Sequence, residues 1–127
     1  MIAADTSSLI AFFDSGQGED ADAIAKALTT DELVLPPPVV AELRSSIKNE
    51  QGYLSVIARA PLITLTDGFW LRAGQARQTI LSKGLKARLI DALIAQCCID
   101  ADVALIARDD DFRHFERYCG LKRLSPR

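Results

Sequence analysis

The sequence predicts an α/β/α sandwich built around a central, mainly parallel sheet of four to five strands. Short apolar runs of β-favouring residues alternate with helical patterns along the chain, which is typical of this architecture. One run, Val103–Ala107, is apolar throughout and bounded by polar residues, as expected for a strand buried on both faces. At 127 residues the chain has the length of one domain. We therefore expect a single domain over residues 1–127.

The order of the elements follows from apolar periodicity and from the residues that begin and end helices. The expected strands are short apolar stretches at residues 1–5, 33–35, 62–65 and 103–107, with a fifth edge strand at 121–124. The expected helices begin after Asp5, at Glu19, after the three prolines 36–38, around Tyr53–Ile57, after Gly68, and at about Lys86.

The last of these helices is unusual because it is apolar nearly all round between Lys86 and Asp102. A helix without a polar face packs against neighbours on several sides. Asp91 is out of keeping with these surroundings. Because an unpaired buried charge is very unfavourable, Asp91 must be paired, protonated or bound to a metal ion.

Acidic residues from distant parts of the chain converge at one edge of this sheet. Asp5 and Asp109 each end a strand, and Asp111 follows two residues later. A right-handed crossover starts its helix at the same carboxyl edge, which places Glu42 and the early-helix Asp91 there as well. Carboxylates that repel one another are stabilised by a cation, and oxygen ligands suit Mg²⁺ or Mn²⁺.

The chemistry favoured by such a site is metal-dependent hydrolysis of a phosphodiester, because a hard ion activates water and stabilises phosphoryl charge. His114 is the only histidine, so no Ser-His-Asp set competes, and there is no glycine-rich phosphate loop. Residues 1–67 carry ten acids and four bases, whereas residues 68–127 carry seven acids and eleven bases. This asymmetry suggests a polyanionic partner, although solvated helix faces explain it equally well. The carboxylates do not separate RNA from DNA.

Four segments resemble the PIN-domain ribonucleases, and most closely the VapC-type toxins of toxin–antitoxin pairs. They occur in the same order and spacing along nearly the whole chain: Asp5–Ile10, Val40–Leu43, Asp91–Ala95 and Arg108–Phe112. One departure is Ala107, where the family often has Thr or Ser before the Arg-Asp pair.

The resemblance implies an endoribonuclease that cuts RNA with Mg²⁺ or Mn²⁺. It also implies a cognate antitoxin that covers the site, and a homodimer. The implied roles are metal-site acids for Asp5, Glu42, Asp91 and Asp109, an accessory acid for Asp111, and a supporting hydroxyl for Thr6 or Ser7.

Our leading hypothesis assigns a role to each of these residues. Asp5, Asp91 and Asp109 hold Mg²⁺ directly or through water, and Glu42 orients or deprotonates the attacking water. The candidates for phosphate contacts are the basic residues Arg72, Arg77, Lys83, Lys86, Arg88 and Arg108.

Three alternatives remain open at this point. The chain could be a PIN-like nuclease that is not a toxin, or a PIN-like RNA-binding domain without catalysis. A phospho-acceptor signalling module also has acids at the carboxyl edge of a parallel sheet, but it needs a lysine at the end of a later strand. Neither 62–65 nor 121–124 clearly supplies one.

Cysteine usage and hydropathy favour a cytoplasmic protein with no membrane segment. The N-terminus lacks the pattern of a signal peptide, and no apolar run reaches the length of a membrane span. Three cysteines, two of them adjacent, make no disulfide framework. We expect buried thiols rather than a zinc site with His114.

Four aromatic residues are candidates for exposed contacts with an antitoxin or a second copy: Phe12, Phe13, Phe69 and Trp70. We expect at least half of them to fill the core instead.

Overall fold

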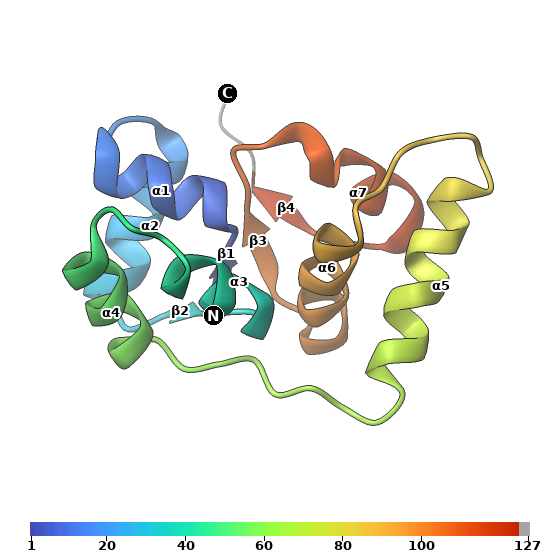
Figure 1. Ribbon diagram of the computed structural model, residues 1–127, viewed down its shortest axis with the longest axis horizontal. Helices are drawn as coiled ribbons and strands as arrows, with labels where there is room; N and C mark the ends of the chain where they lie inside the picture. Colours follow the sequence, from blue (N-terminus) through green and yellow to red (C-terminus); the bar gives the residue numbers. More distant parts are fainter. Residues whose placement is uncertain (125–127) are drawn as a thin grey trace.

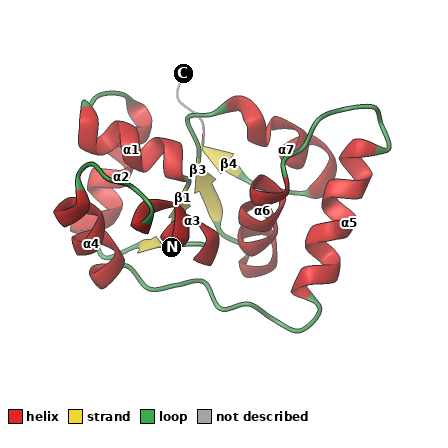
Figure 2. Ribbon diagram, viewed as in Figure 1, coloured by secondary structure: helices red, strands yellow, loops and turns green. Residues whose placement is uncertain are grey.

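Four parallel strands form the centre of the molecule, as predicted. The computed structural model describes residues 1–124, so the last three residues of the expected domain lie outside it. The strands are β1 (Ile2–Ala4), β2 (Leu33–Val34), β3 (Ala104–Ile106) and β4 (Arg123–Leu124), in the spatial order β2-β1-β3-β4 (Figure 2).

All four strands run parallel, and the direction in which strands are added to the sheet reverses between β1 and β3. From β1 the chain crosses over to β2 on one side, whereas β3 adds on the other side and is followed by β4. The pairing of Ala4 with Ile106 keeps the ends of β1 and β3 level, and the Asp5 amide donates to the Ile106 carbonyl at 2.9 Å. In open α/β sheets, ligands bind beyond the carboxyl ends of strands at such a reversal.

Helices surround the sheet in two groups (Figure 1). In this view α1, α2 and α4 lie together toward one end of the molecule, and α5, α6 and α7 lie toward the other. The helices are α1 (Thr6–Asp14), α2 (Glu19–Thr29), α3 (Pro37–Arg44), α4 (Glu50–Arg59), α5 (Phe69–Leu81), α6 (Leu89–Ala101) and α7 (Arg113–Cys119), with a short 3₁₀ turn at Asp110–Phe112.

The apolar pattern of α6 has the expected consequence. Most of its residues are buried, and the helix packs against β3, α3 and α5. The core is formed by buried side chains from all layers, including Leu9, Ile24, Leu35, Ile94 and Leu105. Within the described residues, no helix is both long and apolar enough to cross a bilayer.

The strand expected at residues 62–65 is wrong. Leu62 makes one isolated bridge to Leu35, and the chain then runs on to α5 without further pairing. Leu62 and Leu65 are 54% and 36% exposed, so the apolar side chains of this stretch do not fit a strand buried on both faces.

One helix boundary and one whole helix also differ from expectation. The apolar spacing of Val39, Val40, Leu43 and Ile47 predicts that the helix after the prolines continues to Ile47, but it ends at Arg44, and Ile47 is 96% exposed. In addition, the sequence pattern did not predict α7. Its apolar residues are few because the helix has only seven residues, of which Phe115 is buried.

Candidate metal-dependent active site

Asp5 is a buried carboxylate at the reversal point of the sheet. It directly follows β1, is 5% exposed, and precedes the first turn of α1. The Ser7 hydroxyl donates to Asp5 Oδ2 at 2.6 Å. Burial raises the pKa of Asp5 to about 6, even though the Ser7 hydroxyl and the Thr6 and Ser7 amides favour the charged form.

Glu42 reaches the same place from α3. The Thr6 hydroxyl donates to Glu42 Oε1 at 2.6 Å, across 36 positions of sequence. Adjacent residues of α1 therefore hold two different acids, since Ser7 binds Asp5 and Thr6 binds Glu42. The start of α1 fixes the relative orientation of these two carboxylates.

Asp91 is paired with a cationic side chain. It lies in the first turn of α6 and is 3% exposed. Arg88, one turn earlier, donates from Nε to Asp91 Oδ2 at 3.0 Å and from Nη2 to Oδ1 at 3.3 Å. Burial raises the pKa of Asp91, and the Arg88 guanidinium opposes that rise.

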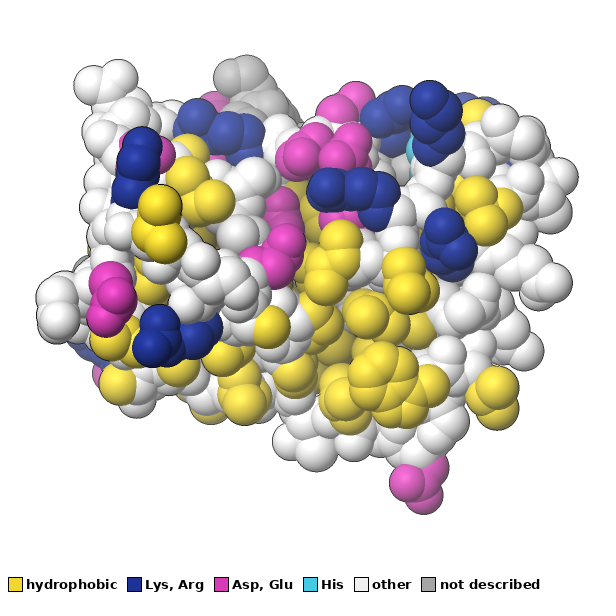
Figure 3. Space-filling view, in the orientation of Figure 1, with side chains coloured by type: hydrophobic (Ala, Val, Ile, Leu, Met, Phe, Trp, Pro, Cys, Tyr) yellow, Lys and Arg dark blue, Asp and Glu magenta, His cyan; other side chains and the backbone are white. Residues whose placement is uncertain are grey.

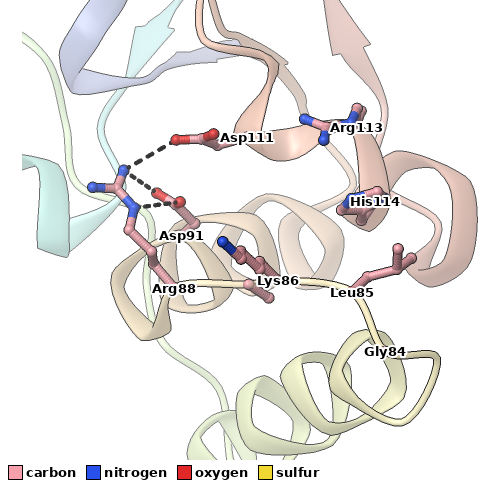
Figure 4. A pocket seen from close by; sticks show the side chains of 9 residues that line it. Gly84, Leu85, Lys86, Arg88, Asp91, Asp111, Arg113 and His114 are labelled. Carbon is pink, nitrogen blue, oxygen red and sulfur yellow. Dashed lines mark hydrogen bonds and ion pairs between the residues drawn. The ribbon is translucent and has the colours of Figure 1, made fainter.

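Arg88 also bridges to the acids that follow β3. Its Nη2 lies 3.5 Å from Asp111 Oδ2, so one guanidinium spans Asp91 and Asp111 (Figure 4). Asp109 Oδ1 accepts the Asp111 amide at 3.2 Å and caps the 3₁₀ turn. Repulsion from Asp109 and Asp111 contributes to the raised pKa of Asp91, which shows that these three acids share one electrostatic environment.

The acids are thus gathered but not arranged around a common point. In the part of the chain that the structure describes, no three acidic, histidine or cysteine side chains stand in positions that would hold a metal ion. The guanidinium of Arg88 lies between Asp91 and Asp111, where it supplies positive charge (Figure 4). Asp5, in contrast, has no basic side chain as a partner among residues 1–124.

An ion pair that the sequence analysis missed positions the chain just before Asp109. The Arg108 guanidinium donates twice to Asp20, at 2.8 Å each, and to the Gln17 carbonyl at 2.8 Å. Asp20 is 1% exposed, and Arg108 lowers its pKa. The Arg108 amide also donates to the Ser8 hydroxyl at 2.7 Å.

Gly18 leaves room for this contact. Its φ is +113°, and a Cβ at this position would lie 2.8 Å from Arg108 Nη2. The sequence gives no local signal for the pairing of Arg108 with Asp20. Acidic residues are common at the start of a helix because they interact favourably with the helix dipole, so Asp20 needs no other explanation.

Comparison with known proteins decides the family. The family described as the PIN domain matches residues 2–118. The chain belongs to the PIN-domain family. A search of curated proteins by sequence finds no match.

Solved structures share the fold of this PIN domain at low sequence identity. A chain of VapBC2 from Rickettsia felis, bound to a DNA fragment from their promoter, has a TM-score of 0.75 at 20% identity, with 98% of each chain covered. VapBC-5 of Mycobacterium tuberculosis, a member of the VapBC family of toxin–antitoxin systems, gives 0.72 at 20%, covering 98% of this chain and 97% of that one. VapBC-1 from nontypeable Haemophilus influenzae gives 0.73 at 19%, with 98% of each chain covered.

Basic residues of the PIN domain fall into two groups. Arg72 and Arg108 form internal ion pairs, with Asp100 at 2.7 Å and Asp20 at 2.8 Å, and Arg77 donates to the Ala87 carbonyl at 2.9 Å. Lys86 and Arg88 line a pocket beside the acids, and Arg88 pairs with two of these acids. Lys83 lies over the Tyr118 ring, 4.7 Å from its centroid. Figure 3 shows acidic side chains near the middle of one face, with basic side chains beside them and a hydrophobic area below.

The cysteines are thiols, as expected. Cys97 and Cys98 are buried in α6, and Cys119 is partly buried. Burial raises the pKa of Cys97 to about 12 and that of Cys98 further, so both thiols stay protonated. Among the described residues, no group of these cysteines with His114 could hold zinc.

The four aromatic candidates divide between core and surface. Phe69 is 2% exposed, and Phe12 and Phe13 are partly buried against the core. Trp70 is 67% exposed and lines an apolar groove of about 480 Å³ with Leu65 and Leu93. Glu42 lies at the same groove, which therefore adjoins the acids.

We predict that Asp5→Asn stabilises the metal-free protein near neutral pH. Because the folded pKa of Asp5 is raised, the native state binds more protons than the unfolded state between about pH 4 and pH 6. The contribution of Asp5 to stability therefore falls as the pH rises through that window. The neutral amide avoids this loss, a gain of up to about 3 kcal/mol at pH 7.5 that shrinks toward pH 4.

Urea denaturation in EDTA at several pH values measures the effect. Asp22→Asn, at an exposed position of α2, is the matched control and should change little. A lower stability of Asp5→Asn at pH 7.5, or a gain that does not depend on pH, would contradict the prediction.

Proposed function

We propose that this PIN domain, as a single domain over residues 1–127, is a Mg²⁺- or Mn²⁺-dependent endoribonuclease. The observation that carries the proposal is the buried Asp5 carboxylate, which has no cationic partner among residues 1–124 and is repelled by the negative charge of Asp91. Oxygen donors of this kind suit a hard divalent ion. Membership in the PIN family, a family of nucleases, supports the same reaction class and gives no support to a phospho-acceptor module.

In this proposal, some acidic residues bind a metal ion and another acts as the general base for the attacking water. Asp5, Asp91 and Asp109 would hold the ion directly or through water, with Asp111 as an accessory acid. When bound, such an ion supplies positive charge at the phosphodiester and lowers the pKa of water. Glu42, whose carboxylate accepts a hydrogen bond from the Thr6 hydroxyl, would accept a proton from the attacking water.

Cleavage assays on total RNA test this proposal. Asp5→Asn and Glu42→Gln should each lower the cleavage rate at least about 100-fold, the size expected for losing a charge-holding or proton-accepting group. Excess EDTA should abolish cleavage by the unchanged protein, and Mn²⁺ or Mg²⁺ should restore it. Asp22→Asn serves as the acid-to-amide control. Full activity of Asp5→Asn, or full activity in EDTA, would overturn the proposal.

Arg88 competes with the ion in this scheme. Its single positive charge offsets part of the negative charge of Asp91 and Asp111, so a cation that binds both acids must displace the guanidinium. Arg88 is thus an internal counter-ion that keeps the acids compatible before a metal ion binds.

We predict that Arg88→Gln binds Mn²⁺ about fivefold more tightly, equivalent to about 1 kcal/mol of removed competition. Titration of free Mn²⁺ followed by electron paramagnetic resonance measures the affinity without any nuclease assay. Arg59→Gln, whose exposed partner is Asp31, is the control. Unchanged or weaker binding by Arg88→Gln would show that Arg88 does not compete with the ion.

We further propose that the protein is the toxin of a toxin–antitoxin pair and acts on RNA in the cytoplasm. The support is the similarity of fold to chains of VapBC structures, together with the apolar groove beside Glu42. An antitoxin segment seated in that groove would cover the acids. The homodimer implied by the resemblance stays a prediction.

For the partner, we predict that the adjacent open reading frame encodes a protein that binds this chain and suppresses its activity. Trp70→Ala should weaken the complex at least about tenfold, because exposed aromatic side chains dominate such interfaces. RNA cleavage by the free Trp70→Ala variant should remain, because Trp70 lies outside the acid cluster. Co-purification and calorimetry measure both points, with the exposed Leu81→Ala as control. No complex, and no relief of growth arrest on co-expression, would count against the pairing.

A further inference from the structure

A pocket of about 440 Å³ adjoins Asp91 and Asp111, and Glu42 is not among the residues that line it. Its floor begins with Asp91 and Asp111, and it extends past the loop before α6 to the start of α7 (Figure 4). A volume of this size falls within the range of pockets that accept small organic groups. If the reacting phosphodiester of a polynucleotide lies at the acids, the adjoining nucleotides must lie beside the acids. This pocket is wide enough and close enough to hold one of them.

The pocket wall carries cations suited to phosphate. Lys86, on the loop before α6, has no acidic side chain as a partner among the described residues. Arg113 lies across the pocket and is held by the Asp110 carbonyl at 2.9 Å, with the Asp110 carboxylate 3.6 Å away. Phosphate oxygens are bound mainly by such lysine and arginine side chains.

An aromatic layer lies beside these cations. The half-buried ring of His114 lines the pocket and stacks on Tyr118, with 6.5 Å between ring centroids and 27° between planes. Lys83 and Arg117 lie over the Tyr118 ring, at 4.7 and 5.3 Å from its centroid. Because the partly buried His114 ring lines the pocket, a planar ligand in the pocket would meet this ring.

Phosphate-binding cations next to an aromatic ring are the pattern that binds single-stranded nucleic acid, because unstacked bases stack on protein rings. In a duplex, the bases are already stacked and paired. We propose that this pocket binds one unstacked nucleotide of single-stranded RNA, adjacent to the cleaved phosphodiester. Its phosphate contacts Lys86 and Arg113, and its base stacks on His114. The proposal rests on the nuclease function proposed above for the neighbouring acids.

Binding can be measured separately from cleavage. The experiment uses the full chain carrying Asp5→Asn, in EDTA, and records fluorescence anisotropy with a labelled short single-stranded RNA. In this background His114→Ala should weaken binding about tenfold, the effect of losing one stacked base. His114→Phe should retain most of the affinity, because it keeps an aromatic face.

Lys86→Gln tests the phosphate contact at an exposed loop position where the fold is not at risk. It should weaken binding and reduce the slope of log affinity against log salt by about one. Lys48→Gln, an exposed lysine between α3 and α4, is the matched control and should change neither quantity. A duplex of the same RNA should bind more weakly than the single strand.

Several results would overturn the inference. The first is the absence of measurable RNA binding, and the second is duplex RNA bound as tightly as single strands. The others concern position 114: an affinity of His114→Ala equal to that of the background protein, or an equal loss of affinity in His114→Ala and His114→Phe. Circular dichroism confirms that each variant is folded. If cleavage depends on Asp5 but substitution of Lys86 or His114 changes neither cleavage nor binding, the nucleotide-binding inference is wrong and the proposed nuclease function stands. If RNA binds through Lys86 and His114 but the unchanged protein does not cleave it, the proposed nuclease function is wrong and the binding inference stands.

Discussion

Repulsion between carboxylates at the carboxyl edge of the sheet is the constraint on which the rest of the site depends. The ends of β1 and β3 are level, so the acids that follow these strands come close by topology alone. Two such charges about 4 Å apart repel by roughly 4 kcal/mol at an effective dielectric near 20. The fold accommodates Asp91 and Asp111 with one guanidinium, that of Arg88. Asp5 is instead buried, and burial, with a smaller contribution from Asp91, raises its pKa.

The beginning of α1 organises the acids that Arg88 does not reach. Thr6 and Ser7 each donate a hydroxyl hydrogen to a different carboxylate, so a single helical turn orients residues from β1 and α3. Short helices often begin with hydroxyl residues that cap their own backbone. Here the hydroxyls of the first turn donate to the carboxylates of Glu42 and Asp5 instead.

Much of the fold was predictable from the sequence because its signals are local. The apolar run of β3 predicted a buried strand, and the apolar pattern of α6 predicted a helix packed on several sides. Asp91 stood out because the residues around it in α6 are apolar. The location of Glu42 followed from the handedness of crossovers. The strand prediction for residues 62–65 was wrong because so short a run of mainly apolar residues is compatible with a strand and with an irregular connection.

The parts of the site that could not be predicted depend on contacts between distant residues. Arg88 looked like one more surface cation, yet its position one turn before Asp91 makes it the counter-ion of two acids. The pair between Arg108 and Asp20 joins residues 88 positions apart. Nothing in the residues around either partner indicates it, because ordinary roles at a strand end and at a helix start already explain both.

The contact of Gly18 with Arg108 has a consequence for the backbone beside Asp109. Arg108 immediately precedes Asp109, and its ion pair with Asp20 lies against Gly18, whose φ of +113° also favours glycine. A side chain at position 18 would meet both partners of this pair, because its Cβ would lie 2.8 Å from Arg108 Nη2 and 2.8 Å from Asp20 Oδ1. A loop residue far along the chain from Asp109 therefore influences how the residue before that acid is anchored, although it contributes no charged group of its own.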